Sequence, residues 1–221
     1  MSCGCCESMN MQCKPQDNPA HVRENFRRMA ALAGVDGAHV SRVIQVHGTA
    51  VVRVDASWQD TPEGDAQITD RPGVALMTLH ADCPPVYLVD CEHHAVGLVH
   101  SGWRGTLANI ARQAVQAMEQ AFGTRREALL ACIGPGIGPC CFEVGMDIAE
   151  QFTERGVHRL GPNGRPMLDL WRIIQADLTA MGVCASIAGE CTCCQPERYF
   201  SHRRQGTERG TMAAFISMIE E

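Results

Sequence analysis

The sequence predicts a mixed α/β fold, of the α+β kind, in which one sandwich of mixed β-sheets is flanked by helices. Two observations predict it. Short runs rich in valine and leucine lie between turn residues, and segments of helical periodicity interrupt them at irregular intervals. The chain has 221 residues, of which 45% are hydrophobic and 20% are charged. These values are typical of a globular protein, and we expect a single domain over residues 1–221.

The first predicted element is a helix. Asn18 before Pro19 favours a helix start, because asparagine accepts from the first free N–H groups and proline has none to satisfy. Apolar residues then recur at helical spacing from Val22 to Ala33, and Gly34 supplies the stop.

Strands follow the first helix. The runs RVIQV (42–46) and VVRVD (51–55) flank residues 47–50, and this pattern predicts two strands that meet at a short turn. Dense valine and leucine with turn residues between the runs then predict three buried strands. These are GVALMTL (73–79), PVYLV (85–89) and AVGLVH (95–100).

The periodicity changes at Thr106. Apolar residues from Leu107 to Phe122 mark one face of a helix, and Gly123 ends it. The remaining elements are predicted from apolar runs between turn residues and from apolar residues at helical spacing. Strands are expected over 128–133, 183–188, 199–204 and 211–219, helices over 144–152 and 170–181, and a surface loop over 161–166.

Charge and hydropathy exclude two classes of partner. The net charge of -6 argues against a nucleic-acid binder, since such proteins need a basic face to displace counterions. No apolar run approaches the roughly 20 residues of a membrane helix, and the polar start is not a signal peptide. We therefore expect a cytoplasmic protein, and a monomer, with no membrane and no nucleic-acid partner.

The 13 cysteines favour metal binding or catalysis over a disulfide framework in a reducing compartment. Cys132 and Cys184 lie in apolar runs, where a thiol acts as a small buried hydrophobe. The N-terminal C-x-C-C cluster has no role that the sequence defines. Cys140 and Cys141 precede a second cysteine-rich segment, C-T-C-C (191–194), which we interpret as lacking the paired spacing of a zinc knuckle.

Three segments place a metal-binding side chain where a predicted strand meets a turn rich in glycine or proline. They are Q-V-H-G-T with His47, H-A-D-C-P-P with Cys83, and V-H-S-G-W-R-G with His100. Two imidazoles and one thiolate are good Zn²⁺ ligands, and three protein ligands leave the fourth tetrahedral position open. Their spacing matches no short metal signature, so a core histidine, a core thiol and a surface histidine remain the alternative.

These segments, together with IGPGIGPCCFEVG and YFSHRRQGTERGTMAAFI, resemble the YfiH-like family. It is also called the laccase-domain or polyphenol-oxidase family and is better described as purine nucleoside phosphorylases. The resemblance runs from about Glu7 to the C-terminus. It implies that His47, Cys83 and His100 hold the metal.

The resemblance also implies the reactions and the substrates. These are phosphorolysis of adenosine, inosine, guanosine or methylthioadenosine, and deamination of adenosine, with Zn²⁺ as the cofactor and phosphate as co-substrate. We expect Arg104 to bind phosphate with its forked guanidinium. Asp82 is expected to move protons near the metal. For Asp65 the alternatives of orienting a histidine ligand and capping a turn both stay open. His80 is not expected to be a ligand.

Two features depart from the family and bear on substrate preference more than on metal binding. Relative to the family pattern we expect a shortened N-terminus: the sequence shows no match to the family's extra strand and Gly-Gly-Val-Ser segment, and MSCGCCESMN stands where that segment would end. The usual T-G-R near the C-terminus is replaced by Arg209-Gly210-Thr211. Arg203 and Arg204 either bind phosphate or form an ordinary basic strand end.

Two other functions compete with the phosphorylase. A copper-dependent polyphenol oxidase follows from the older family name, and copper outcompetes zinc at most such ligands. However, a multicopper cluster needs many imidazoles, and the nine histidines include no H-x-H pair. The second alternative is a non-catalytic module, in which Cys141 or Cys191 completes a closed zinc site. We otherwise expect Cys191 to pack near the metal without binding it.

Overall fold

The computed structural model describes residues 2–32, 34, 39–55, 61–155 and 158–218. The largest sheet has six strands in the order β10-β7-β5-β6-β3-β2. Their bounds are β2 Val51–Arg53, β3 Ala66–Thr69, β5 Pro85–Asp90, β6 Ala95–His100, β7 Leu129–Ile133 and β10 Cys184–Ile187. A second sheet has the order β1-β4-β11, and a third pairs β8 with β9. Their bounds are β1 Val40–Ser41, β4 Ala75–His80, β11 Met212–Ser217, β8 His158–Leu160 and β9 Pro166–Leu168.

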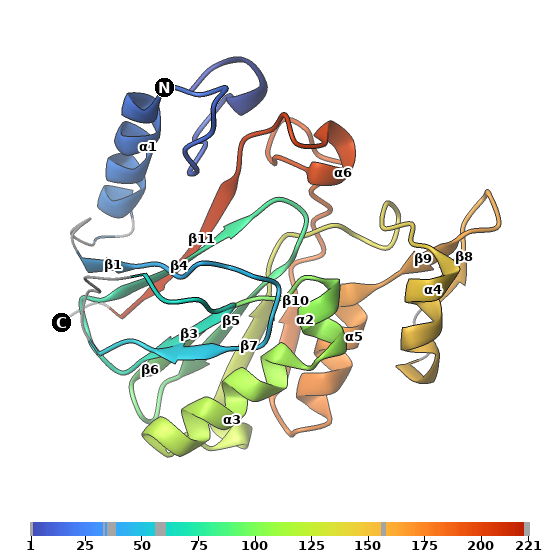
Figure 1. Ribbon diagram of the computed structural model, residues 1–221. Helices are drawn as coiled ribbons and strands as arrows, with labels where there is room; N and C mark the ends of the chain where they lie inside the picture. The colour runs from blue at the N-terminus through green and yellow to red at the C-terminus, as the bar shows by residue number, and fades with distance from the viewer. Residues whose placement is uncertain (1, 33, 35–38, 56–60, 156–157, 219–221) are drawn as a thin grey trace.

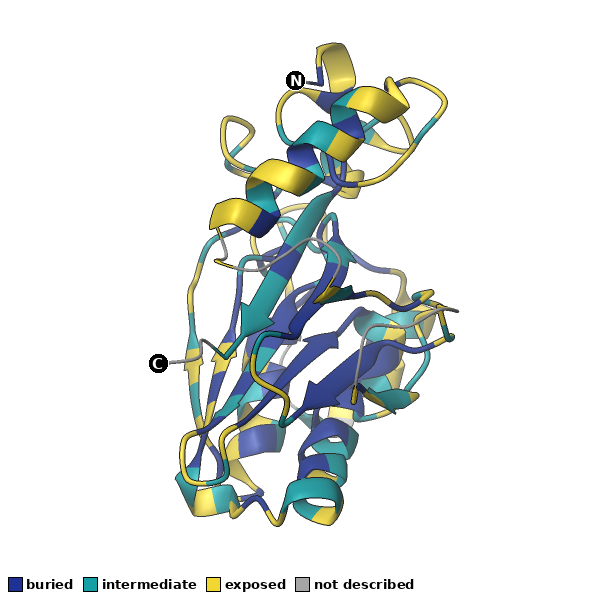
Figure 2. Ribbon diagram, turned by 90° about the vertical axis from the view of Figure 1, so that its left-hand side faces the viewer, coloured by how far each residue is buried: buried dark blue, intermediate teal, exposed yellow. Residues whose placement is uncertain are grey.

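The six-stranded sheet lies in the middle of three layers (Figure 1). Helices α3 (Ile110–Phe122) and α5 (Leu170–Thr179) cover one face, and the three-stranded sheet covers the other. A large apolar core lies under the two helices, and a smaller one around Leu76 and Leu98 lies between the sheets. Every residue of β6 is buried, because this strand is covered on both faces (Figure 2). The predicted mixed sandwich flanked by helices is confirmed.

The remaining helices are short, apart from α1. The structure places them as α1 Pro19–Leu32, α2 Trp103–Leu107, α4 Met146–Ala149 and α6 His202–Gln205, with single 3₁₀ segments at Gly4–Cys6, Arg126–Ala128 and Glu150–Arg155. The N-cap prediction for α1 is confirmed, since the side chain of Asn18 accepts from the Ala20 N–H at 2.9 Å. No helix in the described part of the chain is long and apolar enough to cross a membrane.

The prediction of two strands meeting at residues 47–50 is wrong. Strand β1 ends at Ser41, and β1 and β2 belong to different sheets, with parallel partners β4 and β3. Between them, Ile44 forms only an isolated bridge with Glu63. The apolar alternation therefore marks a connection that crosses between the layers, and this crossing carries His47 to the rim of the large sheet.

The helix predicted from Leu107 is interrupted at Asn109, whose φ of 61° is left-handed. The guanidinium of Arg155 holds the break. It donates to the carbonyl oxygens of Thr106 and Leu107, and to Asn109 Oδ1 at 2.6 Å. Free carbonyls at a helix end need such a donor. The break turns the end of α2 away from α3 and sets Trp103 and Arg104 at the sheet rim.

Two further expectations are corrected. Residues 199–204 are not a strand: Ser201 caps a helical turn by accepting from the Arg204 N–H, and α6 follows. Cys132 and Cys184 are exposed, not buried. In β7 burial alternates, so that Leu129, Ala131 and Ile133 face the core while Cys132 faces outward. The sequence did not predict strand β3, because two of its four residues, Gln67 and Thr69, are polar.

Candidate metal centre and active site

The fold brings His47, Cys83 and His100 together at one end of the large sheet. His100 is the last residue of β6, Cys83 lies in the turn between β4 and β5, and His47 lies in the crossing before β2. Their potential ligand atoms all lie within 4.8 Å of one another. The Cys83 Sγ is 4.0 Å from His47 Nε2, and the two imidazole centroids are 4.9 Å apart.

Gly102 makes room for this cluster. A Cβ atom at this position would lie 3.0 Å from the Cys83 sulfur and 3.1 Å from the ring of His47. Such contacts are tighter than ordinary van der Waals packing allows. The glycine in V-H-S-G-W-R-G is therefore needed for two of the three ligands to approach each other.

Asp65 joins two of the ligand segments. Its buried carboxylate accepts from the backbone N–H groups of Val46, His47 and Gly48 at 3.2, 3.0 and 2.7 Å. It also accepts from His100 Nδ1 at 2.8 Å, which leaves His100 Nε2 facing the cluster. Asp65 thus both caps a turn and orients a histidine, so the two alternatives left open by the sequence occur together. It also stabilises the left-handed backbone of His47, whose φ is 59°.

The electrostatics of the cluster favour a thiolate. Burial alone would raise the pKa of Cys83, but contacts with His100 and His47 outweigh it and lower this pKa to about 6. Burial alone would lower the pKa of His100, whereas its hydrogen bonds with Asp65 and Cys83 raise it to about 9. A site that holds anionic sulfur beside cationic imidazole is a site where a metal cation can replace the protons.

His80 lies beside the cluster, with its ring centroid 5.3 Å from that of His100. Both of its nitrogens are already engaged, Nε2 with Thr78 Oγ1 at 2.7 Å and Nδ1 with the Cys83 carbonyl oxygen at 2.8 Å. Burial lowers its pKa to about 3. His80 therefore supports the Cys83 turn, in line with the expectation that it is not a ligand.

A cavity of about 430 Å³ opens beside His47 and Cys83. This volume is in the range of small-molecule sites. Both predicted catalytic residues, Asp82 and Arg104, line it. The remaining lining residues are Ala81, Trp103, Ile137, Phe142, Leu170, His202, Arg203 and Arg209.

Asp82 is fixed within this wall. Its φ of 98° is unusual for a residue with a side chain. One carboxylate oxygen accepts from Thr192 Oγ1 at 2.7 Å, and the other accepts from the Arg203 N–H at 2.6 Å. Asp82 thereby attaches two distant C-terminal segments to the turn that carries Cys83.

Three guanidinium groups reach the cavity. Arg104 is exposed and stacks on the Trp103 ring, with 4.3 Å between its Cζ and the ring centroid. Arg203 donates to the Cys141 carbonyl oxygen at 3.0 Å. Arg209 donates to Gly210 O and Thr211 Oγ1, and its buried Nε has no hydrogen-bond partner within the described residues. The displaced arginine of the C-terminal motif thus still lines the cavity.

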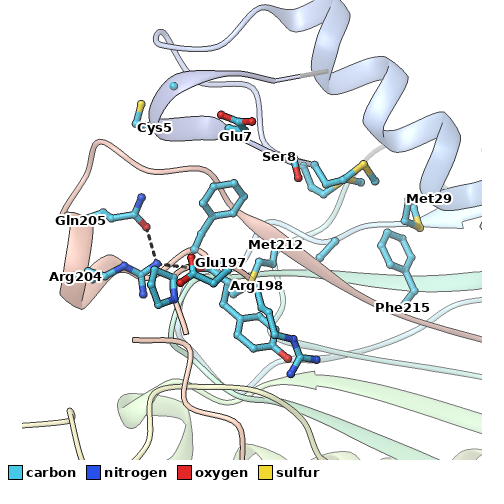
Figure 3. Close-up of a pocket in the computed structure, with 17 residues that line it drawn as sticks. Cys5, Glu7, Ser8, Met29, Glu197, Arg198, Arg204, Gln205, Met212 and Phe215 are labelled. Carbon is cyan, nitrogen blue, oxygen red and sulfur yellow. Dashed lines mark hydrogen bonds between the residues drawn. The ribbon is translucent and has the colours of Figure 1, made fainter. Parts of the chain in front are cut away.

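Arg204 has a different role from its neighbour. It donates to the backbone oxygens of Thr192, Cys193 and Tyr199. It borders a second cavity of about 250 Å³, between the N-terminal segment and the turn before α6 (Figure 3). None of the three predicted ligands lines that cavity. Arg204 therefore ties together the backbone around residues 192–199. Of the two arginines, only Arg203 lines the cavity beside His47 and Cys83.

Neither Cys141 nor Cys191 joins the histidine cluster. Within the described residues the ligand group contains His47, Cys83 and His100 alone, and the two cysteines belong to another group. A closed four-ligand site therefore does not form among the described residues, and two members of the cluster, His47 and Cys83, border the cavity. As expected, Cys191 is not among the ligands of this cluster within the described residues; it belongs to a separate group of four cysteines.

Fold and site together define a mixed α/β domain with an open two-histidine, one-cysteine cluster at a small-molecule cavity. The family model described as multi-copper polyphenol oxidoreductase laccase matches residues 1–219. The chain belongs to this family, also known from its YfiH-named members.

Three comparisons illustrate the relationship. A purine nucleoside phosphorylase of Deinococcus radiodurans is 38% identical over 207 residues, covering 91% of this chain and 79% of the relative. The human purine nucleoside phosphorylase LACC1 is 31% identical over 221 residues, and the match covers 94% of this chain but only 50% of LACC1. The crystal structure of the Bacillus licheniformis protein YfiH has a TM-score of 0.92 and 28% identity, covering 98% of this chain and 88% of that one.

Proposed function

We propose that the protein is a zinc-dependent purine nucleoside phosphorylase. One observation carries the proposal: two residues of the three-ligand cluster, His47 and Cys83, line the same cavity as three arginine side chains. The relatives named purine nucleoside phosphorylase support the substrate class. The substrates are purine nucleosides and inorganic phosphate.

The donor set fits zinc. Two imidazole nitrogens and one thiolate are typical ligands of catalytic zinc, and Asp65 gives His100 the carboxylate partner that metal-binding histidines commonly have. When bound, the ion supplies a Lewis acid with one open coordination position beside the cavity. His47, Cys83 and His100 would hold it.

In phosphorolysis a phosphate oxygen bonds to C1′ of the ribose while the bond from C1′ to the purine nitrogen breaks. The products are ribose 1-phosphate and the free base. The protein must therefore hold a dianion next to the sugar. Arg104 has two donor edges for this purpose, and stacking on Trp103 holds its plane. Arg203 and Arg209 add further positive charge to the cavity lining.

Asp82 acts in this proposal as a positioning residue. Each of its two carboxylate oxygens accepts a hydrogen bond from the protein, so neither oxygen is reserved for the reacting atoms. By binding the Arg203 N–H, it sets the backbone from which that guanidinium extends. The proton-shuttle role expected for Asp82 remains a prediction.

Arg104→Lys tests the phosphate site. Lysine keeps the charge but loses the forked geometry and the stacking, so we expect the phosphate KM to rise by about 10-fold or more. Zinc content and the nucleoside KM should stay as in the parent. Arg172→Lys, an exposed arginine on α5, is the matched control. An unchanged phosphate KM in Arg104→Lys would assign this arginine to fold stability alone.

The copper oxidase is the competing function, and the structure gives it little support. A multicopper centre needs many imidazoles, whereas within the described residues only His47 and His100 share a potential metal cluster. Metal analysis of protein produced without added copper, combined with parallel phenol and nucleoside assays, separates the two functions. We expect zinc and nucleoside turnover; copper with phenol oxidation alone would replace the proposal.

A further inference from the structure

A second cluster of sulfur atoms lies apart from the histidine cluster. Cys140, Cys141, Cys191 and Cys194 place their sulfurs within 4.8 Å of one another. The Cys194 sulfur is 3.5 Å from that of Cys140 and 3.3 Å from that of Cys141. In a tetrahedral zinc site with Zn–S bonds of about 2.3 Å, the sulfurs are about 3.8 Å apart. The four thiols are thus gathered at nearly the separation that one ion requires.

The interpretation that C-T-C-C (191–194) lacks a paired zinc-site spacing is wrong. Cys191 and Cys194 are separated by two residues, which is the C-x-x-C spacing of many zinc sites. The other two ligands come from a turn far away in the sequence. Backbone contacts join the turns: Gly136 bridges Cys191, and the Thr192 N–H donates to the Gly136 carbonyl oxygen at 3.0 Å.

The surroundings suit an anionic metal–thiolate centre. The Gly138 N–H donates to the Cys191 sulfur at 3.2 Å, as backbone amides do to metal-bound thiolates. Zn²⁺ with four thiolates carries a net charge of −2. Two guanidiniums lie beside the cluster, with Arg203 bound to the Cys141 carbonyl oxygen at 3.0 Å and Arg204 to the Cys193 carbonyl oxygen at 2.8 Å.

We propose that Cys140, Cys141, Cys191 and Cys194 bind a second, structural zinc ion in a closed four-sulfur site. Four thiolates complete a tetrahedron and leave no position for substrate. A disulfide would use only two of the four sulfurs, whereas one ion uses all of them. This proposal does not depend on the proposed phosphorylase activity.

The position of this zinc gives it a role. One ligand turn leads directly into Phe142, which lines the active-site cavity, and the other contains Thr192, which binds Asp82. Within the described residues, a few backbone hydrogen bonds and the contact between the Gly138 N–H and the Cys191 sulfur also join the two turns. The ion would therefore fix the part of the cavity wall that Phe142 and Asp82 form.

The test measures zinc in protein purified under reductant and loaded with Zn²⁺ alone. The parent should hold two zinc ions per chain, and Cys83→Ala should hold one. Adding Cys140→Ser and Cys194→Ser to Cys83→Ala should remove the last ion. Both of these cysteines are exposed, so the substitutions leave the apolar core intact. The matched control adds Cys132→Ser and Cys184→Ser, two exposed cysteines on β7 and β10, and should keep the ion.

Spectroscopy on Cys83→Ala gives a reading that does not depend on the cysteine substitutions. X-ray absorption should show only sulfur neighbours of zinc, at about 2.3 Å. The proposal is overturned if folded Cys83→Ala holds no zinc, or if its zinc survives loss of Cys140 and Cys194. A disulfide among the four cysteines in the reduced, zinc-loaded protein would overturn it as well.

Discussion

Cys83→Ala should purify as a folded protein that has lost one zinc ion relative to the parent and more than about 100-fold of its phosphorolysis rate. Loss of even an outer partner of a ligand costs 10–100-fold, and loss of a ligand costs more. Two histidines neither fix a tetrahedral geometry nor neutralise the ion. Folding should persist because neither apolar core includes any of the three ligands. Zinc analysis, circular dichroism and a steady-state rate check these three points.

Cys132→Ala is the matched control for this variant. It removes an exposed thiol on β7 that is not among the residues lining the cavity, and its zinc content and rate should equal those of the parent. If Cys83→Ala keeps the zinc content of the parent, the ligand assignment is wrong.

The second large effect is expected at Asp65. Asparagine has one acceptor oxygen, whereas the Asp65 carboxylate accepts from three backbone N–H groups and from His100. The amide NH₂ of Asp65→Asn would face at least one buried donor. We expect the free energy of unfolding to fall by about 3 kcal/mol. The affinity for zinc should fall by about 10–100-fold, because both histidine ligands lose their support.

Denaturant unfolding and a competitive zinc-chelator titration measure these two effects. Asp55→Asn serves as control, since Asp55 is exposed and its ion-pair partner among the described residues is the surface arginine Arg53, at 3.0 Å. A zinc affinity unchanged in Asp65→Asn would show that this carboxylate stabilises the turn without orienting the ligands.

Strands and ligands were predictable where the signal is local. AVGLVH is buried on both faces of the sheet and PVYLV is buried or half-buried throughout, so their composition alone marks them. His100 ends strand β6 and Cys83 lies in the turn before β5, whereas His47 lies in the crossing before β2; the fold brings all three to one rim. The family resemblance named the same three residues.

The rest depends on contacts distant in sequence. The break at Asn109 needs the guanidinium of Arg155, which apolar periodicity does not encode. In sequence, the crossing at residues 42–50 resembles a hairpin, because the alternation of apolar and polar residues does not show which strand a segment pairs with. The four-cysteine cluster was missed because the C-x-x-C spacing of 191–194 supplies only two of its four cysteines, and its halves meet through contacts distant in sequence, such as the bridge between Gly136 and Cys191. No local signal in either segment indicates that pairing.

One chromatogram tests the central claim most directly. Zinc-loaded protein is incubated with adenosine, once with phosphate and once without it, and the products are separated. Phosphorolysis predicts adenine and ribose 1-phosphate only when phosphate is present, and neither product from Cys83→Ala. Inosine formed independently of phosphate would instead identify a deaminase, and unchanged adenosine in both samples would contradict the account.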